Sequence, residues 1–154
     1  MRETTTAPPL AWSRAFPATP AQAREARRFL AAILDGRPAA DEAILCLSEL
    51  VTNATVHSHS RGGGHYTVRA ELHERHLRVE VQDEGGLWAW PRGGSNGVVV
   101  PTLLQEEQRG AHHLTDADER HGRGLLIVSR LARDWGRRGS SAAGWTVWFE
   151  MDCY

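Results

Sequence analysis

Three polar residues of the chain are spaced so that they could carry out chemistry together. Glu49 and Asn53 are four residues apart, and His57 follows after four more. In a helix this spacing places the side chains on one face. An amide oxygen can bind a hard cation such as Mg²⁺, and a carboxylate one turn away can accept a proton or orient water. Leu45 and Val56 flank the stripe, which indicates a partly closed pocket, although an exposed polar helix face explains the same residues.

A second segment ends in an acidic residue followed by glycines. Residues 79–86 read VEVQDEGG, so Asp83 closes an alternating apolar stretch. Glycines leave room for a planar ligand, and the Asp83 carboxylate can accept a hydrogen bond from an exocyclic amine such as that of adenine. An ordinary Asp-x-Gly turn accounts for the same letters.

A third segment, residues 121–128, reads HGRGLLIV. Gly122 and Gly124 flank Arg123 immediately before an apolar helical pattern. Glycines there expose backbone N–H groups at the positive end of the helix, which is a natural phosphate site, and Arg123 can add charge-assisted contacts. The segment is neither a Walker A loop nor a G-x-G-x-x-G fingerprint.

Hydrophobic periodicity predicts the elements that must position these segments. Thr19 is the expected cap of a first helix, with Pro20 in the first helical position and Gln22 three residues after the cap. Period-two stretches predict the strands, and 3.6-residue periodicity predicts the helices. The predicted elements are strands over 10–16, 66–72, 77–81, 135–138 and 145–151, and helices from 19 to 36, from 40 to 57 and from 124 to about 135.

The order of these elements predicts one domain over residues 10–154, preceded by a loose tail over 1–9. We expect a two-layer α/β sandwich with a mixed, largely antiparallel sheet and helices on one face. Periodicity fails between residues 84 and 121, a stretch too long for a simple connector. We therefore predict a functional lid over residues 87–121.

The composition excludes several classes of protein. Of the 154 residues 41% are hydrophobic, enough for a core, and 18 basic residues oppose 19 acidic ones, which favours neither nucleic acid nor membrane as a partner. The chain has no lysine, which excludes P-loop and Schiff-base lysines. No apolar run is long enough for a signal-peptide core or a membrane span, and two cysteines give no disulfide framework, so we expect a cytoplasmic protein.

Histidines and tryptophans are both numerous in this chain. The eight histidines have no spacing typical of a zinc site, so scattered surface or pocket positions are the expected reading. Four of the six tryptophans fall in predicted strands or at a helix end and are expected in the core. Trp88 and Trp90 fall in the predicted lid, where they could meet a partner or a nucleotide.

Taken together and in this order, the three segments resemble the GHKL ATPase superfamily, whose members share the Bergerat ATP-binding fold. The closest likeness is to its bacterial anti-sigma factor serine/threonine kinases. Residues 49–54, ELVTNA, look like the N box of that family, DEGG at 83–86 like its first glycine box, and GRGL at 122–125 like its second. The terminal GWTVWFE at 144–150 resembles the last strand of the fold. Two positions depart from the pattern: Leu87 lies where a second glycine is usual, and Trp145 where lysine is frequent.

The resemblance implies a role for each matched residue. Glu49 would be the general base, and Asn53 would hold Mg²⁺ against the ATP phosphates. Asp83 would bind the adenine amine with Gly85 giving clearance, and Thr146 would support the adenine pocket. The phosphates would lie on the second glycine box, formed by Gly122, Arg123, Gly124 and Leu125.

The same resemblance implies an ATP- and Mg²⁺-dependent protein kinase. It would phosphorylate a serine or threonine of an antagonist protein and sequester a sigma factor, and such kinases are commonly homodimers. Two other interpretations stay open: a nucleotide-dependent binding module without turnover, and an ATPase accessory domain of a larger assembly. Glu49 favours the kinase, because a pure binding module does not need a base.

Overall fold

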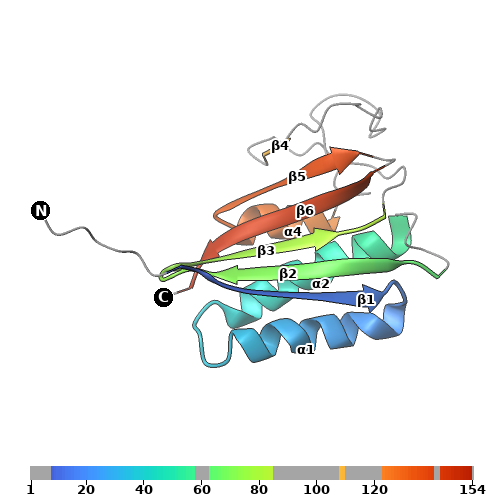
Figure 1. The fold of residues 1–154 in the computed structure, drawn as a ribbon. Coiled ribbons are helices and arrows are strands. Elements are labelled where there is room, and N and C mark those ends of the chain that lie inside the picture. Colours follow the sequence, from blue (N-terminus) through green and yellow to red (C-terminus); the bar gives the residue numbers. More distant parts are fainter. Residues whose placement is uncertain (1–7, 58–62, 85–107, 110–122, 141–142, 154) are drawn as a thin grey trace, which may run out of the picture.

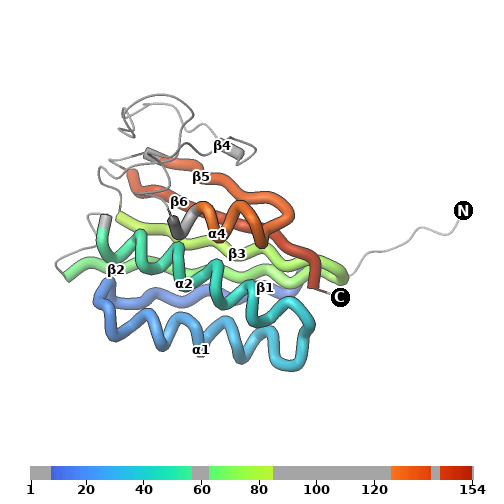
Figure 2. Tube along the Cα trace, turned by 180° about the vertical axis from the view of Figure 1, so that it is seen from behind, coloured from blue at the N-terminus to red at the C-terminus, as the bar shows by residue number. Residues whose placement is uncertain are grey.

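The chain forms a two-layer sandwich, in which the helices α1, α2 and α4 cover one face of a β-sheet (Figures 1 and 2). This computed structural model describes residues 8–57, 63–84, 108–109, 123–140 and 143–153. The elements are β1 (Leu10–Pro17), a 3-10 helix η1 (Pro20–Gln22), α1 (Ala23–Ile33), α2 (Ala40–His57), β2 (His65–Leu72), β3 (His76–Gln82), β4 (Gln108–Arg109), α4 (Arg123–Leu131), β5 (Asp134–Ser140) and β6 (Gly144–Asp152). The predicted α/β sandwich is confirmed.

The sheet has the strand order β1-β2-β3-β6-β5-β4. All pairings among these described strands are antiparallel, so this part of the sheet is antiparallel rather than mixed. β6, the last strand in the chain, lies between β3 and β5 at the middle of the sheet. The end of one central strand therefore meets the beginning of the other.

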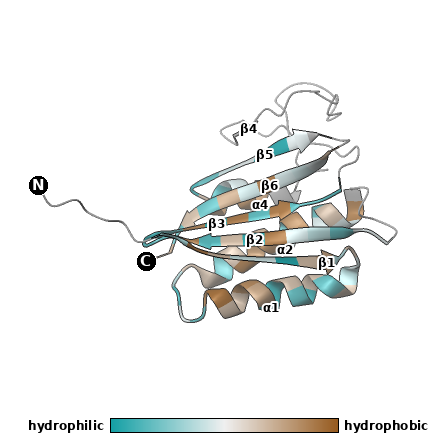
Figure 3. Ribbon diagram, viewed as in Figure 1, coloured by the Kyte–Doolittle hydropathy of each residue, from teal (hydrophilic) through white to brown (hydrophobic). Residues whose placement is uncertain are grey.

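The core lies between the sheet and the helices. Along β2 and β3 every second residue is buried, as in the pair Val68 and Val81 and the pair Ala70 and Val79, while their neighbours are more exposed. Figure 3 colours the same strands by hydropathy and shows hydrophobic and hydrophilic residues along each of them. This alternation follows from the period of two in a strand. The helix α2 lies between α1 and α4, and it also packs against β2, β3 and β6. The sheet and these helices together bury one face of α2, formed by Leu47, Leu50, Val51 and Ala54.

The open face of the sheet carries a network of charged side chains centred on Glu80. Arg138 donates two hydrogen bonds of 3.0 Å to the two carboxylate oxygens of Glu80. Arg78 donates from Nε to Glu80 at 3.0 Å and from a terminal nitrogen to Glu150 at 2.9 Å, and its guanidinium lies 4.2 Å from the centre of the Trp148 ring. Burial tends to raise the pKa of Glu80, but the hydrogen bonds from the two arginines lower it below its usual value. The network joins β3, β6 and β5.

The start of the first helix differs from the expected side-chain cap. Thr19 makes no side-chain hydrogen bond to the helix, and the turn is closed by the main chain, where the N–H of Gln22 donates to the Thr19 carbonyl at 3.0 Å. Pro20 occupies the first position of the 3-10 helix η1, which precedes α1, and not the first position of α1. The predicted capping by the threonine hydroxyl is therefore wrong, because the main-chain hydrogen bond of the turn takes its place.

The helix α4 ends earlier than its apolar pattern predicts. α4 ends at Leu131, and the last helical type of hydrogen bond joins Ala132 to Val128 at 2.8 Å. From Arg133 the chain pairs with β6 instead, through a hydrogen bond of 2.8 Å to the carbonyl of Glu150. Trp135 is consequently a strand residue, and strand pairing outweighs the continuing helical pattern.

Most of the predicted lid, residues 87–121, lies outside the described residues, as do residues 1–7 of the predicted tail. The described part of the lid, Gln108–Arg109, forms β4 and pairs with β5. Part of the predicted lid is therefore an edge strand of the sheet. Among the described helices, none is long and apolar enough to cross a membrane.

Candidate nucleotide site

The three segments singled out in the sequence converge on one end of the sandwich. The C-terminal end of α2, the end of β3 and the beginning of β6 lie together there, and α4 begins toward the same end (Figures 1 and 2). The C-terminus lies at the opposite end. A ligand at this end would meet residues from four elements that are far apart in the chain.

Glu49 and Asn53 lie one turn apart on α2, and both are half-buried. Neither side chain makes a hydrogen bond or ion pair within the described ranges. Three hydroxyls of the same helix behave differently: those of Ser48, Thr52 and Thr55 donate to the carbonyls four residues earlier, at 2.7–2.9 Å. Such bonds satisfy hydroxyl side chains within the helix itself. The side chains of Glu49 and Asn53 therefore remain available to a ligand.

Apolar side chains border this polar pair. Leu45 and Val56 are 44% and 47% exposed, as expected for residues at the rim of an open pocket or surface. On the other face of α2, Cys46 is buried, and burial raises the pKa of its thiol to about 12, with a further contribution from the carboxylates of Glu49 and Glu42. The thiol is therefore protonated at neutral pH and is not a nucleophile.

Asp83 lies directly after β3 and is buried, with 7% of its surface exposed. Two hydrogen bonds join it to Trp145 at the beginning of β6. Its N–H donates to the Trp145 carbonyl at 2.9 Å, and its Oδ1 accepts from the Trp145 N–H at 3.1 Å. A carboxylate has acceptor positions for several donors, so it can accept from more than one group at a time. The structure therefore holds a buried carboxylate in a fixed orientation where the sequence predicts an amine acceptor.

Thr146 follows Trp145 in β6, but its side chain lies on the other face of the sheet. It is buried and pairs with Gln82 on one side and with Arg138 on the other, both on the open face. Alternation places Trp145, and not Thr146, on the covered face beside Asp83. Thr146 thus directly follows the residue that is bonded to Asp83, but the sheet separates its side chain from that of Asp83.

The second glycine box lies at the beginning of α4. The helix starts at Arg123, and Gly124 and Leu125 follow in its first turn, so their main-chain amides stand at its N-terminus. Gly122 and Gly85 lie outside the described residues. The helix N-terminus has the positive partial charge that suits a phosphate group.

Arg137 is a residue of this region that the sequence-based prediction missed. It is fully buried on the covered face of β5, and its guanidinium carbon lies 4.0 Å from the centre of the Trp145 ring. The available signal was the pair Arg137 and Arg138 within one strand, because alternation must turn one of two adjacent residues toward the covered face. Trp135 and Trp145 are buried in the core as predicted, and Trp12 is half-buried against it. Trp148 is buried on the open face instead, under the Arg78 guanidinium, and Trp88 and Trp90 lie outside the described residues.

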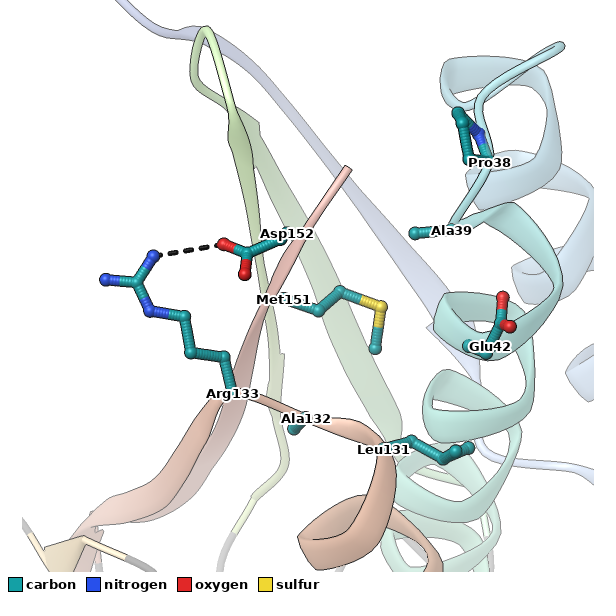
Figure 4. A pocket seen from close by; sticks show the side chains of 8 residues that line it. All are labelled: Pro38, Ala39, Glu42, Leu131, Ala132, Arg133, Met151 and Asp152. Atoms are coloured by element: carbon teal, nitrogen blue, oxygen red, sulfur yellow. Dashed lines mark hydrogen bonds and ion pairs between the residues drawn. The ribbon is translucent and has the colours of Figure 1, made fainter. Parts of the chain in front are cut away.

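A pocket of about 420 Å³ lies at the opposite end of the sandwich (Figure 4). It lies where α2 begins and α4 ends, and these two helix ends have opposite partial charges. The carboxylates of Glu42 and Asp152 line it, and Asp152 is paired with Arg133 at 3.1 Å. None of the site residues that the sequence predicts lines this pocket. Within the described residues no group of three or more His, Cys, Asp or Glu side chains is arranged to hold a metal ion.

Comparison with known proteins agrees with this geometry. The histidine kinase-like ATPase domain family matches residues 16–151, and the chain belongs to this family. ATP binding is what an ATPase domain of this type implies. A curated relative, the anti-sigma F factor of Clostridium acetobutylicum, is 42% identical over 45 residues, which are 29% of this chain and 32% of the relative. The match thus spans about a third of that protein.

Proposed function

We propose that this protein is an ATP-dependent serine/threonine protein kinase of the anti-sigma type. The observation that carries the proposal is the pair of half-buried polar side chains, Glu49 and Asn53, at the same end of the sandwich as the buried Asp83 carboxylate. A general base, a metal ligand and an adenine acceptor are the parts that phosphoryl transfer from ATP requires. The name of the relative supports the anti-sigma class.

ATP fits the charges of this end of the molecule. Asp83 accepts hydrogen bonds and has no hydrogen to donate, so it would select the exocyclic amine of adenine, with Gly85 giving clearance beside the base. Thr146 stays a candidate for supporting the adenine pocket from β6, although its side chain is directed to the open face. The main chain from Gly122 through Leu125, with the Arg123 guanidinium, would cradle the phosphates.

Asn53 would hold Mg²⁺, because amide oxygens are among the oxygen ligands of this ion. The ion would supply neutralisation of phosphate charge. Glu49, one turn earlier, would orient a serine or threonine hydroxyl and take its proton. The hydroxyl oxygen forms a bond to the γ-phosphorus as the bond between that phosphorus and the ADP oxygen breaks, and ADP leaves with its electron pair.

The phosphoacceptor in this proposal is a small antagonist protein, and a sigma factor is held when the antagonist is phosphorylated. A homodimer would be the working form. Nucleic acid and membrane are not among the proposed partners, because the net charge of −1 provides no general attraction to either. The setting is the cytoplasm, where sigma factors act.

The test uses a Glu49→Ala variant together with Glu42→Ala as a matched control. Glu42 lies in the first turn of the same helix, is exposed, and is at the end remote from Asp83. Partners are captured from a native lysate with and without ATP, and single-turnover transfer from γ-labelled ATP to the captured protein is measured beside ATP affinity. Glu49→Ala should lower transfer by about 10²–10⁴-fold at nearly unchanged affinity. Glu42→Ala should match the wild type.

Three results would count against the kinase. Transfer at the wild-type rate by Glu49→Ala would remove Glu49 as the base. A wild type that binds ATP and its partner yet never transfers phosphate would establish a nucleotide-dependent binding module. A folded wild type that does not bind ATP would end the proposal altogether.

A further inference from the structure

Arg137 is a charged side chain placed where charge is costly. Its exposed fraction is 0%, and it projects from β5 into the layer between sheet and helices, as its pairing with Val147 requires. Arginine is almost never fully buried without a specific interaction that compensates for desolvation. The planar guanidinium lies 4.0 Å from the centre of the Trp145 ring, which is close enough for a strong cation–π interaction.

Trp145 connects this cation to the carboxylate of the proposed adenine pocket. Its ring stacks against the guanidinium of Arg137, while its main-chain N–H donates to Asp83 and its carbonyl accepts from the Asp83 N–H. A buried positive group and a buried negative group are thus held by one residue.

The adjacent arginine provides a contrast within the same strand. Arg138 lies on the open face, its side chain is 41% exposed, and both of its terminal nitrogens are bound to Glu80. Its role in joining β5 to β3 is therefore accounted for without a ligand. Arg137 instead contacts Trp145, the residue that orients Asp83, on the covered face.

We propose that Arg137 is a positioning residue that sets the purine specificity of the site. By stacking on Trp145, it fixes the residue that orients the Asp83 carboxylate, so that a base with an exocyclic amine is preferred over one with a carbonyl group. This inference rests on the proposed function, because it concerns the same ATP site. A residue of β5, which lies outside the sequence motifs, would then take part in recognising the nucleotide base.

The experiment compares the wild type with Arg137→Met, Arg137→Lys and Arg138→Met. Calorimetric titrations with Mg-ATP and Mg-GTP give the ratio of the two affinities for each protein, and thermal unfolding without nucleotide shows that each variant is folded. Arg137→Met should reduce the preference for ATP about tenfold, because the stacked cation is lost. Arg137→Lys should restore part of the preference, since an ammonium group can also make a cation–π contact with the Trp145 ring, and Arg138→Met should keep the wild-type ratio.

Should Arg137→Met not fold, Trp145→Leu serves in its place, because it removes the ring and keeps the main-chain N–H. It should lower the same ratio. An unchanged ratio in a folded Arg137→Met, or an equal loss in Arg138→Met, would overturn the role of Arg137 and leave the ATP site intact. A folded wild type without ATP binding would overturn the proposed function and this inference with it.

Discussion

Replacing Asp83 by asparagine tests the proposed adenine contact with little change in shape. The structure shows Oδ1 of Asp83 accepting from the Trp145 N–H at 3.1 Å. The asparagine carbonyl oxygen can take over this hydrogen bond, so the connection between β3 and β6 is kept. The NH₂ group then replaces the second carboxylate oxygen, which changes an acceptor into a donor.

The magnitude follows from the hydrogen bond that is lost. A charge-assisted hydrogen bond to a buried group is worth about 1.5–3 kcal/mol, and each 1.4 kcal/mol is about tenfold in affinity. Because Asp83 is only 7% exposed, solvent cannot replace the lost acceptor. Asp83→Asn should therefore weaken ATP binding by roughly 10- to 150-fold. GTP, whose guanine carbonyl can accept from the new NH₂, should lose less or gain.

The assay is a calorimetric titration of wild type and Asp83→Asn with both nucleotides at the same Mg²⁺ concentration. Asp83→Ala is the control, because it removes both the adenine acceptor and the acceptor for Trp145. It should weaken the binding of both nucleotides without favouring GTP. Wild-type affinity for ATP in a folded Asp83→Asn would refute the assignment of Asp83 to the adenine amine.

Three further changes test the metal ligand, a turn and the open-face network. Asn53→Ala should fold and lose the Mg²⁺-dependent part of ATP affinity; equal Mg²⁺ dependence in titrations of mutant and wild type would remove Asn53 from the site. Gly139→Ala should lower stability by at least about 2 kcal/mol in thermal unfolding, because Gly139 has φ of +114° and its new Cβ would collide with the carbonyl oxygen of Gly144; an unchanged Tm would contradict this. Glu80→Gln should cost about 1–2 kcal/mol at pH 7. Because the folded pKa of Glu80 lies below its usual 4.5, this contribution is present above about pH 5 and disappears as the pH falls through the folded value. A difference between mutant and wild type that does not shrink at all as the pH is lowered below 4.5 would argue against the ion-pair network.

Elements with strong periodicity were predictable from the sequence. The bounds of α2, residues 40–57, are confirmed, because one face of that helix is apolar over five turns and glycine and proline residues delimit it. The hairpin of β2 and β3 is likewise confirmed by its strict alternation. These features depend on near neighbours in the chain, which a sequence displays directly.

Features that depend on distant pairing were not predictable. The end of α4 is decided by the hydrogen bond of Arg133 to Glu150, seventeen residues later in the chain, and no local pattern announces it. The contact of Arg137 with Trp145 depends on the register between β5 and β6. The site roles of Glu49, Asn53, Asp83 and the glycine boxes come from the family resemblance and remain predictions.

The position of β6 has a consequence for how the protein becomes functional. Asp83 and Trp145 are 62 residues apart, yet they join neighbouring central strands. Closing a segment of this length costs conformational entropy and makes the pairing a late and slow event in folding. Until β6 has been synthesised and inserted between β3 and β5, the carboxylate proposed to bind the purine has no fixed orientation. A ribosome-bound chain would therefore acquire the proposed nucleotide affinity only after β6 has emerged, and bound nucleotide would then stabilise the pairing of β6 in the sheet.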